Sequence, residues 1–270
     1  MTLPALTDAR LDVTGRVATL TMLRHDVRNE LTGTALVEDL LAVIGWINSG
    51  LDISVLVLTG GGTAFSSGGN IKHMLAREGA FAGDIAEVQR QYRLGIQRLA
   101  LAMDRLEVPA IAAINGPAIG AGLDLACMCD LRLAADTATM GESFLDVGII
   151  PGDGGAFMLQ RLIGYQRAAE LTFTARIIGA EEAQRLGLVL EVLPPEELLP
   201  RAAALAATIA AKPPQALRLA KRLMKAAPRQ QLSDHLDQAA LFQGICHRTE
   251  DHAEAITAIL ARRPPSFTGR

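Results

Sequence analysis

The sequence predicts an α/β core with parallel strands, followed by an all-helical C-terminal part. Short apolar runs alternate with amphipathic segments up to about residue 195, and such alternation favours parallel strands joined by right-handed crossovers. After Pro194-Pro195 the pattern changes to consecutive helical segments. We therefore expect two parts, a ligand-binding core over residues 1–195 and a helical oligomerisation region over residues 196–270.

The elements of both parts follow from apolar periodicity and turn residues. Residues 11–14 and 17–21, around Gly15-Arg16, are typical of a β-hairpin, and the apolar spacing of residues 34–47 is typical of a helix. The later core elements that we expect are strands at 54–59, 110–114, 131–134 and 188–192, and helices at 87–106, 121–128 and 156–163. The C-terminal helices are expected at 196–211, 214–227, 232–246 and 249–261.

Composition excludes several classes of function. The formal net charge of −3 over 270 residues leaves no basic surface for nucleic acid. We expect no secretory signal, no membrane-spanning helix and a cytoplasmic location, because the required apolar runs are missing. Cys127, Cys129 and Cys246 lack the spacing of a zinc site, so we interpret them as reduced thiols and expect no bound metal.

Two predicted buried strands each run into a glycine-rich turn. The first turn contains Gly68-Gly69, and the second, Gly120-Ala121-Gly122, opens a helix. Open α/β sheets bind ligands at the carboxyl ends of their strands, and the first N–H groups of a helix have no intrahelical partner. One N–H group from each turn would form an oxyanion hole, although either turn taken alone is more often a plain tight turn. Neither turn matches a phosphate-binding motif or a serine nucleophile elbow.

Asp124 is the acidic residue nearest to the second turn. It follows Ala121 by three residues, so both lie on one face of the predicted helix. Its neighbours in the sequence are apolar, and a buried acid needs a compensating partner or a function. We expect burial to raise the pKa of Asp124, which would suit proton transfer; a salt-bridged structural acid is the alternative.

Four segments in order resemble the enoyl-CoA hydratase/isomerase, or crotonase, superfamily. They are FSSGGNIK at 65–72, AIAAINGPAIGAGLDLA at 110–126, CDLR at 129–132 and GIIPGDGG at 148–155. The resemblance implies a crotonase-like (ClpP/crotonase) spiral of ββα repeats with a helical trimerisation region, assembled as a homotrimer or hexamer. It implies acyl-CoA thioester substrates, with coenzyme A entering as part of the substrate and no separate cofactor.

The resemblance also assigns roles to individual residues. The backbone N–H groups of Gly69 and Ala121 would form the oxyanion hole. The coenzyme A contacts that it implies are Arg28, Ser67, Gly69, Ile71, Lys72 and, from a neighbouring subunit, Phe267.

This sequence departs from the superfamily pattern at both acidic positions. Family hydratases use two glutamates to hold and activate water; Asp124, one methylene shorter, stands at the first position and Phe144 at the second. Glu142, Asp146 and Asp153 are the nearby candidates to replace the missing acid. We expect an enoyl-CoA hydratase first, then an enoyl-CoA or dienoyl-CoA isomerase with Asp124 as its single proton shuttle, and third a non-catalytic CoA-binding protein.

Overall fold

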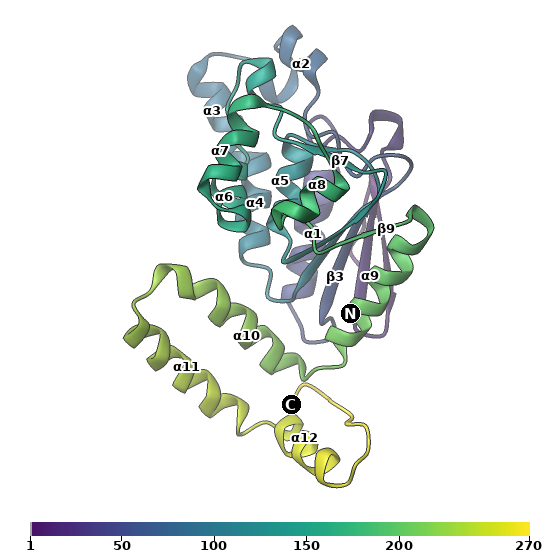
Figure 1. Ribbon diagram of the computed structural model, residues 1–270, viewed down its shortest axis with the longest axis vertical. Helices are drawn as coiled ribbons and strands as arrows, with labels where there is room; N and C mark the ends of the chain where they lie inside the picture. Colours follow the sequence, from purple (N-terminus) through teal and green to yellow (C-terminus); the bar gives the residue numbers. More distant parts are fainter. Residues whose placement is uncertain (1) are drawn as a thin grey trace.

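The computed structural model describes residues 2–270 and shows an α/β core with a helical arm below it (Figure 1). The main sheet has six strands in the order β1-β2-β3-β4-β6-β9. Its strands are β1 (Ala9–Thr14), β2 (Val17–Met22), β3 (Val55–Gly60), β4 (Ala110–Ile114), β6 (Leu131–Ala135) and β9 (Glu191–Leu193). β1 and β2 form the predicted antiparallel hairpin, and every later neighbouring pair is parallel, as predicted.

A second, three-stranded sheet was not predicted from the sequence. It consists of β5 (Ala118–Ile119), β7 (Thr139–Gly141) and β8 (Ile178–Gly179). These strands are two or three residues long, too short to show an alternating pattern. The small sheet matters for function because β5 leads directly into the second glycine-rich turn.

The helices of the core cover the sheet and carry most of the loops that surround the pocket. They are α1 (Leu36–Asn48), α2 (Ile71–Ala76), α3 (Ile85–Leu94), α4 (Ile96–Asp104), α5 (Ala121–Met128), α6 (Gly155–Ile163), α7 (Tyr165–Thr174), α8 (Ala180–Leu186) and α9 (Pro195–Ala210). The prediction of one helix over 87–106 was wrong, because the chain breaks at Gly95 into α3 and α4. Gly95 has φ −105° and ψ −113°, outside the helical region, and glycine adopts such a conformation at little cost.

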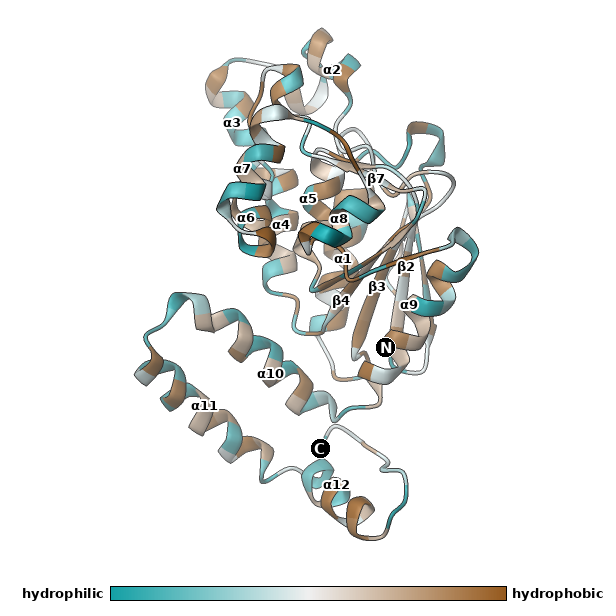
Figure 2. Ribbon diagram, viewed as in Figure 1, coloured by the Kyte–Doolittle hydropathy of each residue, from teal (hydrophilic) through white to brown (hydrophobic). Residues whose placement is uncertain are grey.

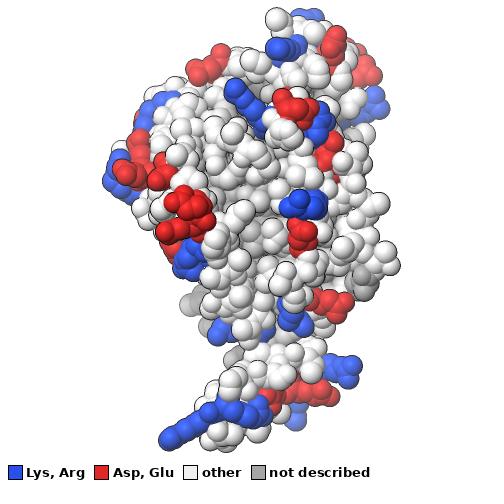
Figure 3. Space-filling model, turned by 90° about the vertical axis from the view of Figure 1, so that its right-hand side faces the viewer, with Lys and Arg blue, Asp and Glu red and all other residues white. Residues whose placement is uncertain are grey.

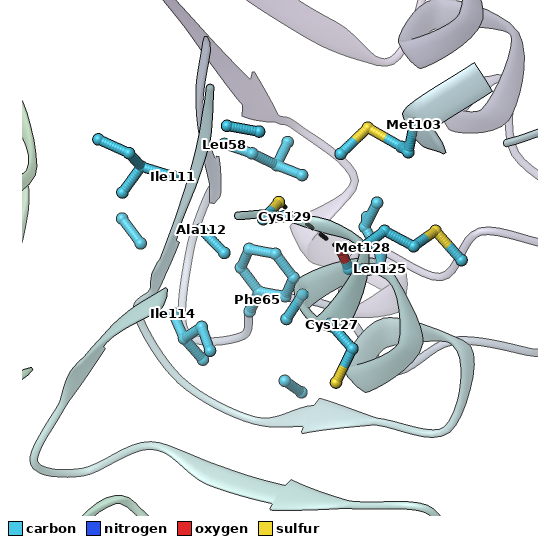
Figure 4. Close-up of a cluster of buried hydrophobic side chains, with 14 of the residues drawn as sticks. Leu58, Phe65, Met103, Ile111, Ala112, Ile114, Leu125, Cys127, Met128 and Cys129 are labelled. Carbon is cyan, nitrogen blue, oxygen red and sulfur yellow. Dashed lines mark hydrogen bonds between the residues drawn. The ribbon is translucent and has the colours of Figure 1, made fainter. Parts of the chain in front are cut away.

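The hydrophobic core lies between the main sheet and the helices packed on it. All five residues of β4 and all eight of α5 are buried, and Figure 4 shows the Phe65 ring between these two elements. Cys127 and Cys129 lie in this cluster as free thiols, and burial raises the pKa of both. Because the thiolate is the reactive form, these two cysteines act as small apolar side chains here.

The chain after residue 195 does not separate from the core at once. Helix α9 buries Leu198, Ala202 and Ala206 in the main core cluster. The arm in Figure 1 begins only with α10 (Pro214–Ala226) and continues through α11 (Leu232–Cys246) and α12 (Glu250–Leu260). Helix α10 is fastened to the core by Arg218, which donates to the carbonyls of residues 47, 50 and 53, and by Lys221, which bonds Asp130 and the carbonyl of residue 108.

The surface has no continuous patch of one charge on the face shown in Figure 3, where basic and acidic side chains are interspersed. Apolar side chains, in contrast, are exposed along the arm, and Figure 2 shows hydrophobic residues along the ribbons of α11 and α12. The largest of them are Met224, Leu232, Leu236, Leu241, Ile245, Ile256, Ile259 and Leu260. Among residues 2–270, no helix is both long and apolar enough to span a membrane.

Candidate active site

The two glycine-rich turns lie side by side at the carboxyl ends of β3 and β4. Ser66 and Ala118 form a parallel bridge between them, and the Ile119 N–H donates to the Ser66 carbonyl at 3.0 Å. Ser66 is itself anchored, because its hydroxyl donates to the Asn29 carbonyl at 2.7 Å. The backbone segments after the two strands are therefore held in fixed register.

Glycine is required where these segments touch. Gly68 has φ +77°, and a Cβ there would lie 2.7 Å from the Ile119 carbonyl oxygen and 2.8 Å from the Ala121 nitrogen. A Cβ on Gly122 would overlap the Ser66 backbone in the same way. Real Cβ contacts begin at about 3.4 Å, so any larger residue at either position would push the two turns apart.

The N–H groups of Gly69 and Ala121 are free donors, one from each turn. The neighbouring N–H groups of residues 67, 68 and 70 donate to Arg28, Ser66 and Thr32, and that of residue 120 donates to Gly141. Within the part of the chain that the structure describes, no hydrogen bond uses the N–H of Gly69 or of Ala121. Both residues line the same pocket. An oxyanion hole requires two free donors, and these two belong to residues that line one cavity.

The pocket has a volume of about 190 Å³ and mostly apolar walls. One wall comes from residues 31–38 at the start of α1, a second from α2 and the loop after it, and a third from α3 and α4. The apolar side chains that line it are Leu31, Val37, Met74, Phe81, Tyr92, Ile96, Phe144 and Ile149. Apolar walls with a few polar groups at one end are typical of a small-molecule site.

Phe144 occupies the pocket beside the second turn. Its ring lies 3.7 Å from the position that a Cβ of Gly120 would take, next to the free N–H of Ala121. The side chain is 7% exposed and lines the cavity. The position that the family resemblance assigned to a second glutamate is therefore filled by an aromatic ring, which can neither bind nor activate water.

Asp153 is the buried carboxyl group in the pocket lining; the other acid there, Glu38, is exposed and forms an ion pair with Arg98. Asp153 is 6% exposed, and within the described chain its Oδ1 is buried without a hydrogen-bond partner. Burial raises the pKa of Asp153 from its ordinary value of 3.8 to about 6. A carboxyl group that titrates near neutral pH and faces a pocket suits general acid–base catalysis.

The backbone on each side of Asp153 is held by a different helix. Gln97 on α4 donates to the Gly152 carbonyl at 2.9 Å. The N–H of Gly155, the first residue of α6, donates to Asp124 Oδ2 at 3.0 Å. Asp153 lies between these two bonds, so its position in the pocket wall is fixed from both sides.

Asp124 and Glu142 are fully buried and are absent from the lining of the pocket. Asp124 reaches Gly155 as described, and Glu142 accepts a hydrogen bond from the Thr172 hydroxyl at 2.6 Å. The expected rise in the pKa of Asp124 is confirmed, with burial as the largest cause, followed by the charges of Glu142 and Asp153. Burial also raises the pKa of Glu142.

The remaining predicted residues lie outside the pocket. Asp146 is exposed on the short 3-10 helix Leu145–Val147. Arg28, Ile71 and Lys72 are exposed and Ser67 is half-buried, around the mouth of the first turn. Phe267 lies on the C-terminal tail, beyond the arm.

Sequence reasoning missed the side chains that shape the pocket. Met74, Phe81 and Tyr92 come from segments without a recognisable motif, and Ile149, although it lies in the 148–155 segment, was given no role. The missed role of Thr172 depends on α7 lying against Glu142, which no local pattern reveals. The one available signal was that Phe144 stands in place of a family glutamate.

Comparison with known proteins identifies the family. The family model described as enoyl-CoA hydratase/isomerase matches residues 12–270. The chain belongs to the enoyl-CoA hydratase/isomerase family. It is 35% identical to the crotonyl-CoA hydratase of Syntrophomonas wolfei, over 94% of this chain and 95% of that protein. It is 33% identical to the 2,3-dehydroadipyl-CoA hydratase of Escherichia coli, over 94% and 96%.

Solved structures confirm the predicted crotonase-like fold. An enoyl-CoA hydratase from Bacillus anthracis superposes with a TM-score of 0.91 at 33% identity, covering 98% of this chain and 100% of that one. An enoyl-CoA hydratase structure from Streptomyces coelicolor gives the same TM-score at 30% identity, covering 100% and 97%. The chain is thus an enzyme of the hydratase/isomerase family.

Proposed function

We propose that the protein is an enoyl-CoA hydratase that adds water to a 2-enoyl-CoA. The observation that carries the proposal is one pocket lined by two free backbone N–H groups and by a carboxyl group with a pKa of about 6. Donors stabilise the enolate oxygen of a thioester, and the carboxyl group exchanges the proton that hydration requires. The named activities of the relatives above agree with this chemistry.

In the proposed mechanism, the thioester oxygen accepts hydrogen bonds from the N–H groups of Gly69 and Ala121. The Asp153 carboxylate takes a proton from water as the water oxygen attacks C3 of the enoyl group. Electrons of the double bond move to the thioester oxygen, and the resulting enolate is stabilised by the two donors. Asp153 then returns its proton to C2, which gives a 3-hydroxyacyl-CoA. The cycle uses no cofactor besides the coenzyme A of the substrate.

A specific observation favours isomerisation as the second candidate. Phe144 fills the place of the second family glutamate, and Asp153 is the buried carboxyl group that lines the pocket, since Glu38 is exposed and paired with Arg98. One carboxylate can remove a proton at one carbon and return it at another. The same enolate and the same two N–H donors would serve a double-bond shift without the addition of water.

A panel of enoyl-CoA thioesters, incubated in H₂O and in D₂O, separates the two candidates. Hydration adds the mass of one water and places one solvent hydrogen at C2. Isomerisation leaves the mass unchanged in H₂O and moves the double bond. If neither product forms from any thioester while coenzyme A esters bind, the catalytic proposal is refuted.

We also propose that the coenzyme A part lies over the first turn and that the enzyme is a homotrimer or hexamer. Gly69 lines the pocket, Ser67 and Ile71 lie within two residues of it along the chain, and the side chains of Arg28 and Lys72 are exposed for contact with phosphates. The exposed apolar side chains of α11 and α12 support assembly, since a patch of this kind is usually covered by a partner. Light scattering that gives the mass of a single chain at micromolar concentration would contradict the assembly.

A further inference from the structure

Two carboxyl groups meet behind the pocket wall, where four elements of the fold come together. Asp124 comes from α5 and Glu142 from the residue after β7, while Gly155 begins α6 and Thr172 lies on α7. A Cβ on Gly155 would overlap both Asp124 Oδ1 and Glu142 Oε1. The two oxygens therefore converge on one point beside the Gly155 backbone.

These two oxygens are the atoms of the pair that lack a donor. Asp124 Oδ2 and Glu142 Oε2 are bonded by Gly155 and Thr172, at 3.0 and 2.6 Å. Asp124 Oδ1 and Glu142 Oε1 are fully buried and have no hydrogen-bond partner among the described residues. Two ionised carboxylates in this arrangement would face each other without a donor and with like charges, which is costly in a water-free site.

A single proton between the two oxygens removes this cost. With the proton on Asp124, its Oδ1–H donates to Glu142 Oε1, and its Oδ2 remains the acceptor for the Gly155 N–H. Glu142 then accepts from Asp124 and from Thr172, so every polar atom of the pair is bonded. The Thr172 hydroxyl, at 2.6 Å, stabilises the ionised form of Glu142.

We propose that Asp124 is a positioning residue, held as a neutral carboxylic acid that donates to Glu142 and, through Gly155, fixes the backbone next to Asp153. The neighbouring charges agree with this assignment. Burial and the charges of Glu142 and Asp153 raise the pKa of Asp124. For Glu142, burial raises the pKa, while the hydrogen bonds from Thr172 and Asp124 lower it. The Cys127 thiol, also near both carboxyl groups, has its pKa raised by burial and is neutral.

Asp124→Asn tests the proposal, because an asparagine amide reproduces the neutral acid. Its N–H donates to Glu142 and its oxygen accepts from Gly155, so kcat/KM should stay within about threefold of wild type. The pH profile should also stay unchanged, since neither side chain carries a charge. Asp124→Leu makes neither bond and should lower kcat by roughly a hundredfold, the usual effect of displacing a catalytic group by about 1 Å. Had Asp124 been the catalytic acid, Asp124→Asn would lower kcat by roughly 10²–10⁴.

Infrared spectroscopy detects the proton on Asp124 without any turnover. The kinetic test rests on the proposed hydratase activity, whereas the infrared test remains valid if that activity is wrong. At about pH 8, above the pKa of about 6 of Asp153, the wild type should show the C=O band of a protonated, buried carboxylic acid. Asp124→Asn should lack this band, and the exposed control Asp136→Asn should keep it. A band that survives in Asp124→Asn, or a hundredfold loss of kcat in that variant with an unchanged melting temperature, would overturn the proposal.

Discussion

Gly122→Ala should separate the two turns that supply the proposed oxyanion hole. In the structure, a Cβ on Gly122 would lie 2.7 Å from the Ser66 carbonyl carbon and 2.8 Å from Ser66 Cβ. Ordinary contact begins at about 3.4 Å, and Ser66 is backbone that cannot rotate away, so the segments must move apart by roughly 1 Å. Overpacking of this kind costs about 1–3 kcal/mol of folding free energy. A misplacement of about 1 Å lowers the rate roughly a hundredfold.

The loss should appear in kcat rather than in KM, because the enolate forms only along the reaction path. The assay is the steady-state rate on the best enoyl-CoA of the panel, measured beside the melting temperature. Gly45→Ala is the matched control, since a Cβ at this exposed position of α1 would meet nothing within 4 Å. In a helix interior, that change should stabilise by up to about 1 kcal/mol. Should Gly122→Ala keep kcat within about threefold, the two N–H groups do not act together on one oxygen.

Three further outcomes are expected. Asp153→Asn should lower kcat by roughly 10²–10⁴. Wild-type activity should fall as the pH drops below about 6, where Asp153 becomes protonated. Activity that is constant down to pH 5 would exclude Asp153 as the base. Because burial raises the pKa of Asp153 from 3.8 to about 6, ionisation of Asp153 lowers the folding stability as the pH rises through this range. In urea unfolding at pH 8, Asp153→Asn should therefore be on the order of 3 kcal/mol more stable than the wild type. A variant no more stable than wild type would show that Asp153 is solvated. Arg218→Ala should destabilise by about 3 kcal/mol, since it removes the bonds to the carbonyls of residues 47, 50 and 53 and leaves Glu107 with Arg222 alone. Arg222, which bonds the same glutamate, has a side chain that is 55% exposed, so the control Arg222→Ala should cost less than about 1 kcal/mol of folding stability. Equal losses of stability in the two variants would refute the role of buried Arg218 in fastening α10 to the core.

The sequence by itself determined the elements whose signal is local. Apolar spacing predicted β4 and α5 to the residue. The two glycine-rich turns were recognisable because the glycines and the start of the following helix are adjacent in the sequence. The apolar neighbours of Asp124 were enough to predict its burial and the direction of its pKa shift.

Only the tertiary structure decided which groups face the pocket. Asp124 and Asp153 were both candidates by sequence, yet one is enclosed against Glu142 and the other lines the cavity. This choice depends on α6 packing against α5 and on α7 lying against Glu142, through contacts of Gly155 and Thr172 with residues about 30 positions away. Side-chain direction at a loop is set by such distant contacts, because a loop has no fixed periodicity of its own. For the same reason, a pattern of residue types could name the acids near the site but could not assign their roles.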